Sequence, residues 1–184
     1  MTAPAPLHPL LARLDGGDRR SIGAAAAVAW EVHKDPHLIP VLIQGMVSGS
    51  PVIQMRAADA LEKVSVIDPA PLTPYRRSLL QMFTLDLGQE VRWHLLQVAP
   101  RMAWTPWQAR RLGGFIRESL HHPSHIVKAC ALEALVDLLR QDPTARAEVE
   151  RLVADALRSP VPSLQARARK LRRRLRAQAA RPRG

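Results

Sequence analysis

The stretch VKACALEALVDL, residues 127–138, decides the fold of this chain. It sets small and apolar residues at helical spacing between polar ones. Similar blocks begin at residues 52, 91 and 164, with the sequences VIQMRAADALEKV, VRWHLLQVAPRM and LQARARKLRRRL. Their paired small or apolar positions begin at residues 57, 95, 131 and 168, so successive blocks lie 38, 36 and 37 residues apart. A period of this length predicts a stack of helical repeats, each burying its apolar face against its neighbours.

The composition agrees with closely packed helices. Hydrophobic residues make up 47% of the chain, but aromatic residues only 4%. Ala, Leu and Val supply most of the apolar share, a mixture that favours helices over a β-sandwich. The single cysteine, Cys130, lies inside a repeat and excludes a disulfide within the chain. It is expected to be a buried structural thiol.

Proline marks the expected helix starts. Asp or Thr immediately precedes proline at residues 35–36, 73–74, 105–106 and 142–143, where the side chain can cap a helix and proline costs no hydrogen bond. Thr105 and Gln108 also fit a capping box. Pro100 is expected to kink its helix. The predicted helices span about 7–14, 19–34, 36–48, 51–67, 73–86, 88–103, 105–120, 124–141, 143–158 and 162–179.

The second helix of each pair resembles a HEAT repeat. The resemblance is carried by Val91-Arg92 with Leu95-Leu96 and by Val127-Lys128 with Ala131-Leu132. Similarity to the HEAT-repeat (armadillo-like) family, here in a small bacterial-type form, implies an all-α, right-handed α-α superhelix of about five antiparallel helix pairs. The expected organisation is an N-terminal segment over 1–18 with a candidate short helix, a repeat domain over 19–176 and a basic disordered tail over 177–184.

Solenoids present extended surfaces, so we expect a non-catalytic scaffold or adaptor that binds a protein partner on its second helices. Trp93 stands where the other blocks have Met55, Ala129 and Ala166, and is expected to be an exposed functional aromatic. Arg92 and Lys128 have an internal alternative, in which they bond to carbonyls or acids of neighbouring repeats. The residues expected on this partner surface are Arg56, Asp59, Arg92, Trp93, Gln97, Lys128 and Glu133.

The net charge of +11 is concentrated near the carboxyl end. Residues 1–150 hold 16 Lys and Arg against 15 Asp and Glu, whereas residues 151–184 hold 11 against one. The alternative function is therefore nucleic-acid binding through phosphate contacts. A charged terminal cap on the solenoid would explain the same pattern. The segment has no aromatic side chain, which disfavours single-strand recognition. The candidate anion-binding residues are Arg167, Arg169, Lys170, Arg172, Arg173, Arg174 and Arg176.

Signatures of other classes of protein are missing. No glycine-rich phosphate loop or Gly-x-Ser-x-Gly elbow occurs, and DNA-repair alkylpurine glycosylases with HEAT-like folds offer only a distant analogy, because no residue matches their essential aspartate. His121, His122 and His125 could hold a metal, but Pro123 forces a turn between them, so neither metal nor cofactor is expected. No signal peptide or membrane span is expected, and the chain is predicted to be cytoplasmic. The oligomeric state is left open.

Overall fold

The computed structural model describes residues 6–16 and 23–180, and all regular secondary structure among them is helical. The prediction of an all-α chain is confirmed. The chain divides into two compact units, residues 1–102 and residues 103–184, called unit 1 and unit 2 below. Each described helix ends within the unit in which it begins.

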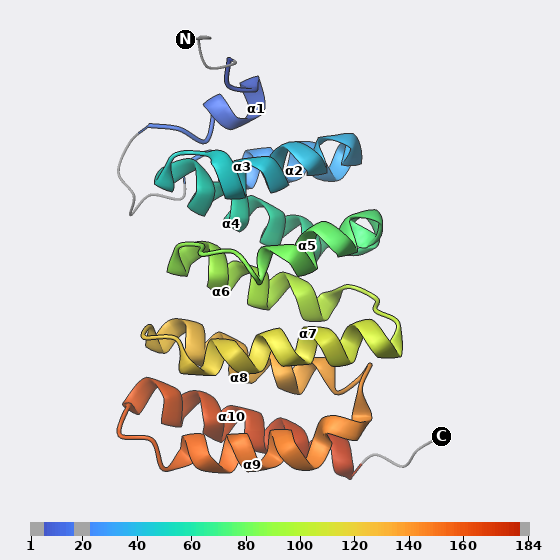
Figure 1. The fold of residues 1–184 in the computed structure, drawn as a ribbon, viewed down its shortest axis with the longest axis vertical. Helices are drawn as coiled ribbons and strands as arrows, with labels where there is room; N and C mark the ends of the chain where they lie inside the picture. The colour runs from blue at the N-terminus through green and yellow to red at the C-terminus, as the bar shows by residue number, and fades with distance from the viewer. Residues whose placement is uncertain (1–5, 17–22, 181–184) are drawn as a thin grey trace. The chain divides into compact units, whose positions relative to one another are not determined.

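Unit 1 is organised around one long helix. Its helices are α1 (Pro9–Ala12), α2 (Ala25–Lys34), α3 (Ile39–Ser48), α4 (Pro51–Ile67), α5 (Arg76–Met82) and α6 (Gln89–Val98). α4 packs against α2, α3 and α6 (Figure 1). It can do so because Ala57, Ala58 and Ala60 present little bulk, which lets helices approach on several sides, and all three are fully buried.

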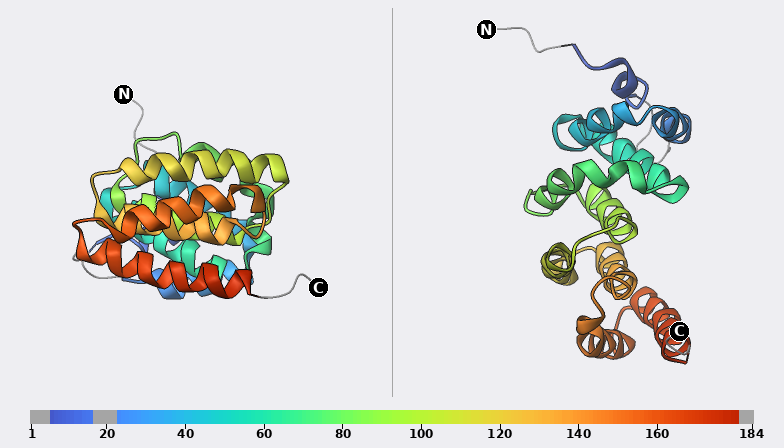
Figure 2. Two further views of the ribbon diagram at one scale, coloured as in Figure 1. Left: turned by 90° about the horizontal axis from the view of Figure 1, so that it is seen from below. Right: turned by 90° about the vertical axis from the view of Figure 1, so that its right-hand side faces the viewer.

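Unit 2 consists of two helical hairpins. α7 (Pro106–Glu118) pairs with α8 (His125–Leu138), and α9 (Arg146–Leu157) pairs with α10 (Pro162–Ala179). α8 also packs against α9 and α10. Figure 2 shows α7 and α9 in one layer of the unit and α8 and α10 in the other. The short connections make each pair antiparallel, as the sequence predicts for these two pairs.

The apolar repeat predicts the core correctly in three of its four blocks. The paired positions in α4, α6 and α8 are buried. Leu96 of α6, for example, is 1% exposed. Of the paired positions in α10, Ala168 is buried but its neighbour Arg169 is exposed. α10 packs against α8 and α9 on one side. The outward position of the last block therefore lies in solvent, where arginine is favourable.

Several helix starts follow the proline signals, and others are displaced. Thr105 forms the expected capping box with Gln108, and Pro106 is the first residue of α7. Pro36 and Pro143 instead open short 3-10 turns, Pro36–Leu38 and Pro143–Ala145, that precede α3 and α9. Pro74 lies inside a longer 3-10 segment, Ala70–Tyr75, so α5 begins only at Arg76.

Pro100 was expected to kink its helix, but the helix ends before it. α6 stops at Val98 and a 3-10 turn, Ala99–Arg101, follows, because proline lacks the amide hydrogen that the α-helix needs. At the amino end, the predicted residues 19–22 of the second helix lie outside the described residues. At the other end, α10 extends to Ala179, so residues 177–179 are helical rather than part of a disordered tail.

The helices of the described segments differ in length and polarity. α10 is the longest at 18 residues, but it is rich in arginine. Each described helix is too short or too polar to cross a bilayer.

Candidate functional site

Arg56 was expected on the partner surface of the second helices, and this expectation is wrong. Its side chain is 2% exposed. The guanidinium Nη1 donates to the carbonyl oxygens of Leu14 at 2.9 Å and Gly16 at 2.6 Å. Arg56 therefore ties α4 to the segment that follows α1 and cannot reach a partner from this position.

Replacing Arg56 with methionine is expected to destabilise unit 1 by about 2–3 kcal/mol, because the carbonyl oxygens of Leu14 and Gly16, the first of them buried, lose a charged donor while the apolar volume is largely kept. Urea denaturation followed by circular dichroism checks this. Arg77→Met, at an exposed arginine of α5, is the matched control and should change stability by less than about 0.5 kcal/mol. Equal effects of the two substitutions would contradict the structural role of Arg56.

Arg92 bonds to backbone carbonyls, which was the alternative to its contacting a partner. Its Nη1 donates to the carbonyl of Phe83 at 2.9 Å and its Nη2 to that of Leu85 at 2.7 Å, so it binds the start of α6 to the turn after α5. Gln97 and Lys128 are half-buried on α6 and α8. The partner surface expected from the sequence is thus partly used for holding the fold together.

Trp93 is half-buried rather than fully exposed. Its ring lies beside that of His94, with the ring centroids 5.7 Å apart. The prominent exposed aromatic residues among the described helices are Trp30, 54% exposed, and Trp107, 60% exposed. The Arg111 guanidinium lies 5.5 Å from the centre of the Trp107 ring, a cation–π contact within α7.

The acidic residues of α8 hold two of the arginines of α10. Glu133, expected on the partner surface, forms ion pairs with Arg167 and with Arg174, the latter at 3.1 Å. Arg174 also pairs with Asp137. Both arginines belong to the candidate anion-binding set, yet their charge is already matched inside unit 2. Their role agrees with the cap alternative for this helix.

The other five cations of α10 are exposed and form what we call the cationic face: Arg169, Lys170, Arg172, Arg173 and Arg176. No carboxylate of the described segments forms an ion pair with any of them. The helix itself contains no acidic residue to offset their charge. Arg169, Arg173 and Arg176 follow one another at i, i+4 and i+7, so they share one side of the helix. The buried stripe of Ala168, Leu171 and Leu175 anchors another side.

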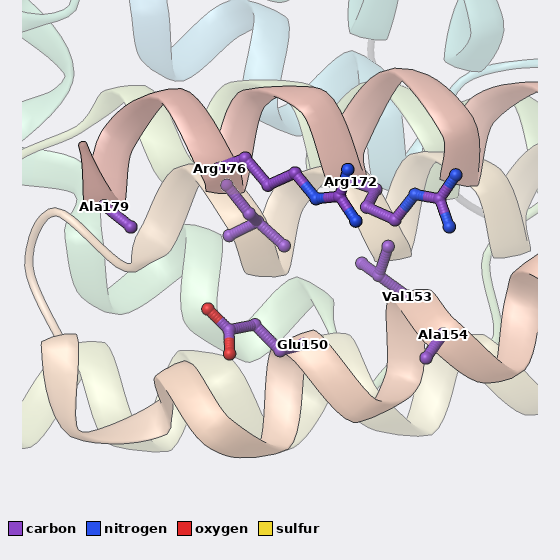
Figure 3. Close-up of a pocket in the computed structure, with 7 residues that line it drawn as sticks. Glu150, Val153, Ala154, Arg172, Arg176 and Ala179 are labelled. Atoms are coloured by element: carbon purple, nitrogen blue, oxygen red, sulfur yellow. The ribbon is translucent and has the colours of Figure 1, made fainter.

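A shallow hollow of about 290 Å³ lies between α9 and α10 (Figure 3). Val153, Ala154, Leu175 and Ala179 make its apolar lining. Three charged residues also line it: Arg172 and Arg176 of α10 and Glu150 of α9. Because the hollow is apolar and carries a carboxylate, it does not suit a phosphate group.

The histidine motif of residues 121–125 does not converge in unit 2. His121 and His125 are exposed, and the Nδ1 of His122 accepts a hydrogen bond from the Ser124 amide at 3.0 Å. These three side chains form no group with metal-ligand spacing, as the turn at Pro123 implies.

Within the described residues, Asp59, Glu62 and His94 are the one set of three that could hold a metal ion; we call it the α4–α6 cluster. One ligand atom of each lies within 4.8 Å of the others. Asp59 Oδ2 and His94 Nδ1 are buried without a hydrogen-bond partner. Burial lowers the pKa of His94, although the charges of Asp59 and Glu62 oppose this shift. Burial therefore favours the neutral form of the His94 imidazole, which is the form that can bind a metal ion.

Sequence reasoning named Asp59 but missed this cluster. Two signals were present in the chain. Asp59 and Glu62 stand at i and i+3, which places both carboxylates on one side of α4. His94 follows Asp59 by 35 residues, close to one repeat period, and residues one period apart become neighbours when repeats stack.

In comparisons with known proteins, no family model matches the chain, and no curated protein is similar enough to indicate a relative. The resemblance to HEAT repeats therefore stays a prediction from the repeat pattern. Any function has to be argued from the chain's own side chains.

Proposed function

We propose that this protein is a non-catalytic, HEAT-like solenoid that binds the phosphate backbone of nucleic acid through the cationic face of α10. The observation that supports this best is the set of five exposed cations, on a helix without an acidic residue. Exposed cations of one sign on one helix create the positive potential that attracts a polyanion.

A role of α10 as a charged terminal cap would explain only some of its cations. Arg167 and Arg174 meet the acids of α8, and such contacts complete the packing of a last helix. Solvation of the outer face would be served equally well by mixed charges, which keep a surface soluble without a strong field. The five remaining cations are the excess that a bound polyanion would neutralise.

A duplex is the form of nucleic acid that this surface favours. The cationic face has no aromatic ring on which bases could stack, so contacts to bases in a single strand would be weak. A duplex offers a higher density of phosphates along its axis. Recognition would then depend on charge and helix geometry rather than on base sequence.

The protein partner expected from the sequence has less support. Arg56 and Arg92, two of its expected contact residues, bond to backbone carbonyls within unit 1, and Glu133 bonds to arginines of α10. A protein partner becomes the better explanation if nucleic acid does not bind.

Fluorescence anisotropy with a labelled DNA duplex tests the proposal. If all five cations contact phosphates, log K should fall with log salt with a slope of about −4.5, because each contact releases about 0.9 counterion. Raising the salt from about 50 mM to about 200 mM should then weaken binding by up to about 500-fold. A labelled single-stranded RNA of equal length is the comparison and should bind less tightly. Absence of binding at the lower salt would contradict the proposal.

A further inference from the structure

We propose that the α4–α6 cluster is a metal-binding site for a divalent transition-metal ion, with Zn²⁺ as the best fit. The ligands would be Asp59 and Glu62 from α4 and His94 from α6. All three lie in unit 1, so the inference is independent of the function proposed for α10.

The spacing of the three ligand atoms is close to that of a metal site. They lie within 4.8 Å of one another. Ligands at about 2.0–2.1 Å from a tetrahedral zinc ion stand about 3.4 Å apart. Small rotations of the carboxylate side chains can supply the remaining approach.

Two buried polar atoms of the cluster are placed to bind a metal ion. Asp59 Oδ2 on α4 and His94 Nδ1 on α6 are both shielded from solvent and lack a hydrogen-bond partner. A buried polar atom without a partner is unfavourable, because it has lost its hydrogen bonds to water and gained none in return. A metal ion bound to both atoms would remove this cost at two positions at once.

One oxygen of each carboxylate, in Asp59 and in Glu62, is already held by a neighbouring cation. Asp59 Oδ1 accepts from Lys63, while its other oxygen is the unpartnered one. Glu62 Oε1 accepts from Arg101 Nη1 at 2.6 Å, and the same nitrogen donates to Ser65 Oγ at 2.8 Å. Partners of this kind hold metal ligands in position in known sites.

Lys63 and Arg101 also oppose cation binding by their charge. Their side chains are 31% and 33% exposed, so each ammonium or guanidinium group has access to solvent. This competition predicts moderate affinity, in the micromolar range, rather than the tight binding of a structural zinc site.

The donor set favours zinc over the alkaline-earth ions. Imidazole nitrogen suits Zn²⁺, Ni²⁺ and Cu²⁺, whereas Mg²⁺ and Ca²⁺ take oxygen ligands almost alone. The cluster has no cysteine, which excludes a thiolate site. Three protein ligands leave the fourth position of a tetrahedral ion open to water.

The test is a titration of the full chain with Co²⁺ and Zn²⁺ at about pH 7.5, since protons compete with metal ions for such ligands at lower pH. Binding at the cluster should give the strong visible absorption of tetrahedral Co²⁺, which Zn²⁺ then displaces, and Zn²⁺ should raise Tm by several degrees. His94→Gln should weaken binding at least about 100-fold, more than the loss of an outer partner does. Asp59→Asn, which keeps the side-chain shape, should act in the same direction.

His125→Gln is the matched control, because this exposed histidine of α8 belongs to the other histidine-rich segment of the chain. It should leave the affinity and the Co²⁺ spectrum unchanged. The proposal is overturned if wild-type protein gives no Co²⁺ absorption, or if His125→Gln removes binding that the folded Asp59→Asn variant retains. Circular dichroism of each variant separates loss of ligands from loss of folding.

Discussion

Leu96→Asp is expected to unfold unit 1. Leu96 is 1% exposed at the paired position of the second block, on α6, and this helix packs against α4. The substitution loses about 1.5–3 kcal/mol of apolar burial and forces a carboxyl group into a buried position, which costs several kcal/mol more. The sum is comparable with the total stability of a domain, about 5–15 kcal/mol. Far-UV circular dichroism at room temperature should show a large loss of helix.

Leu85→Asp is the matched control for this experiment. It makes the same chemical change at a leucine that is exposed in the turn after α5. We expect a change in stability of less than about 0.5 kcal/mol and an unchanged spectrum. If Leu96→Asp melts at the wild-type temperature, the register that places this residue in the core is wrong.

Replacing Arg169, Arg173 and Arg176 together with glutamine is expected to reduce duplex affinity by about 100-fold at low salt. Each lost phosphate contact of about 1 kcal/mol is roughly a fivefold change, and three contacts multiply. The salt slope should fall in magnitude by about 2.7, since about 0.9 counterion is released per contact. All three side chains are exposed, so thermal stability should stay close to that of the wild type.

A second triple variant separates local contacts from net charge. Arg77, Arg110 and Arg140 are exposed arginines outside α10, and their replacement by glutamine lowers the net charge equally. This variant should lose far less affinity. Similar losses in the two variants would mean that only overall charge attracts DNA, which would remove the cationic face as a site.

The repeat pattern predicted the helical class and three of the four buried blocks, because burial in helices is periodic. Ala57 and Leu95 were placed in the core by spacing alone, and both are buried. Thr105 was identified as a helix cap because capping depends on a few neighbouring residues. The pattern was less successful at Pro74 and Pro100, where proline ends or delays an α-helix through the backbone of nearby turns.

The candidate sites were harder to predict, because the sequence gives the number of charged residues but not which of them form ion pairs. Arg174 and Arg173 are neighbours in an arginine run, yet one is bound by Glu133 and Asp137 and the other is exposed. Arg56 has the character of a surface residue, but the carbonyl groups of residues 14 and 16 hold it inside.

By itself, the sequence determined the helical class of this protein, the three buried blocks and the strong positive charge of α10. These properties follow from local spacing and composition, which act within one helix or between consecutive helices. The tertiary structure decided which charges are matched and brought His94 to Asp59 and Glu62 across α4 and α6. Such contacts depend on the register between packed helices, and a shift of one residue turns a side chain by about 100° around its axis.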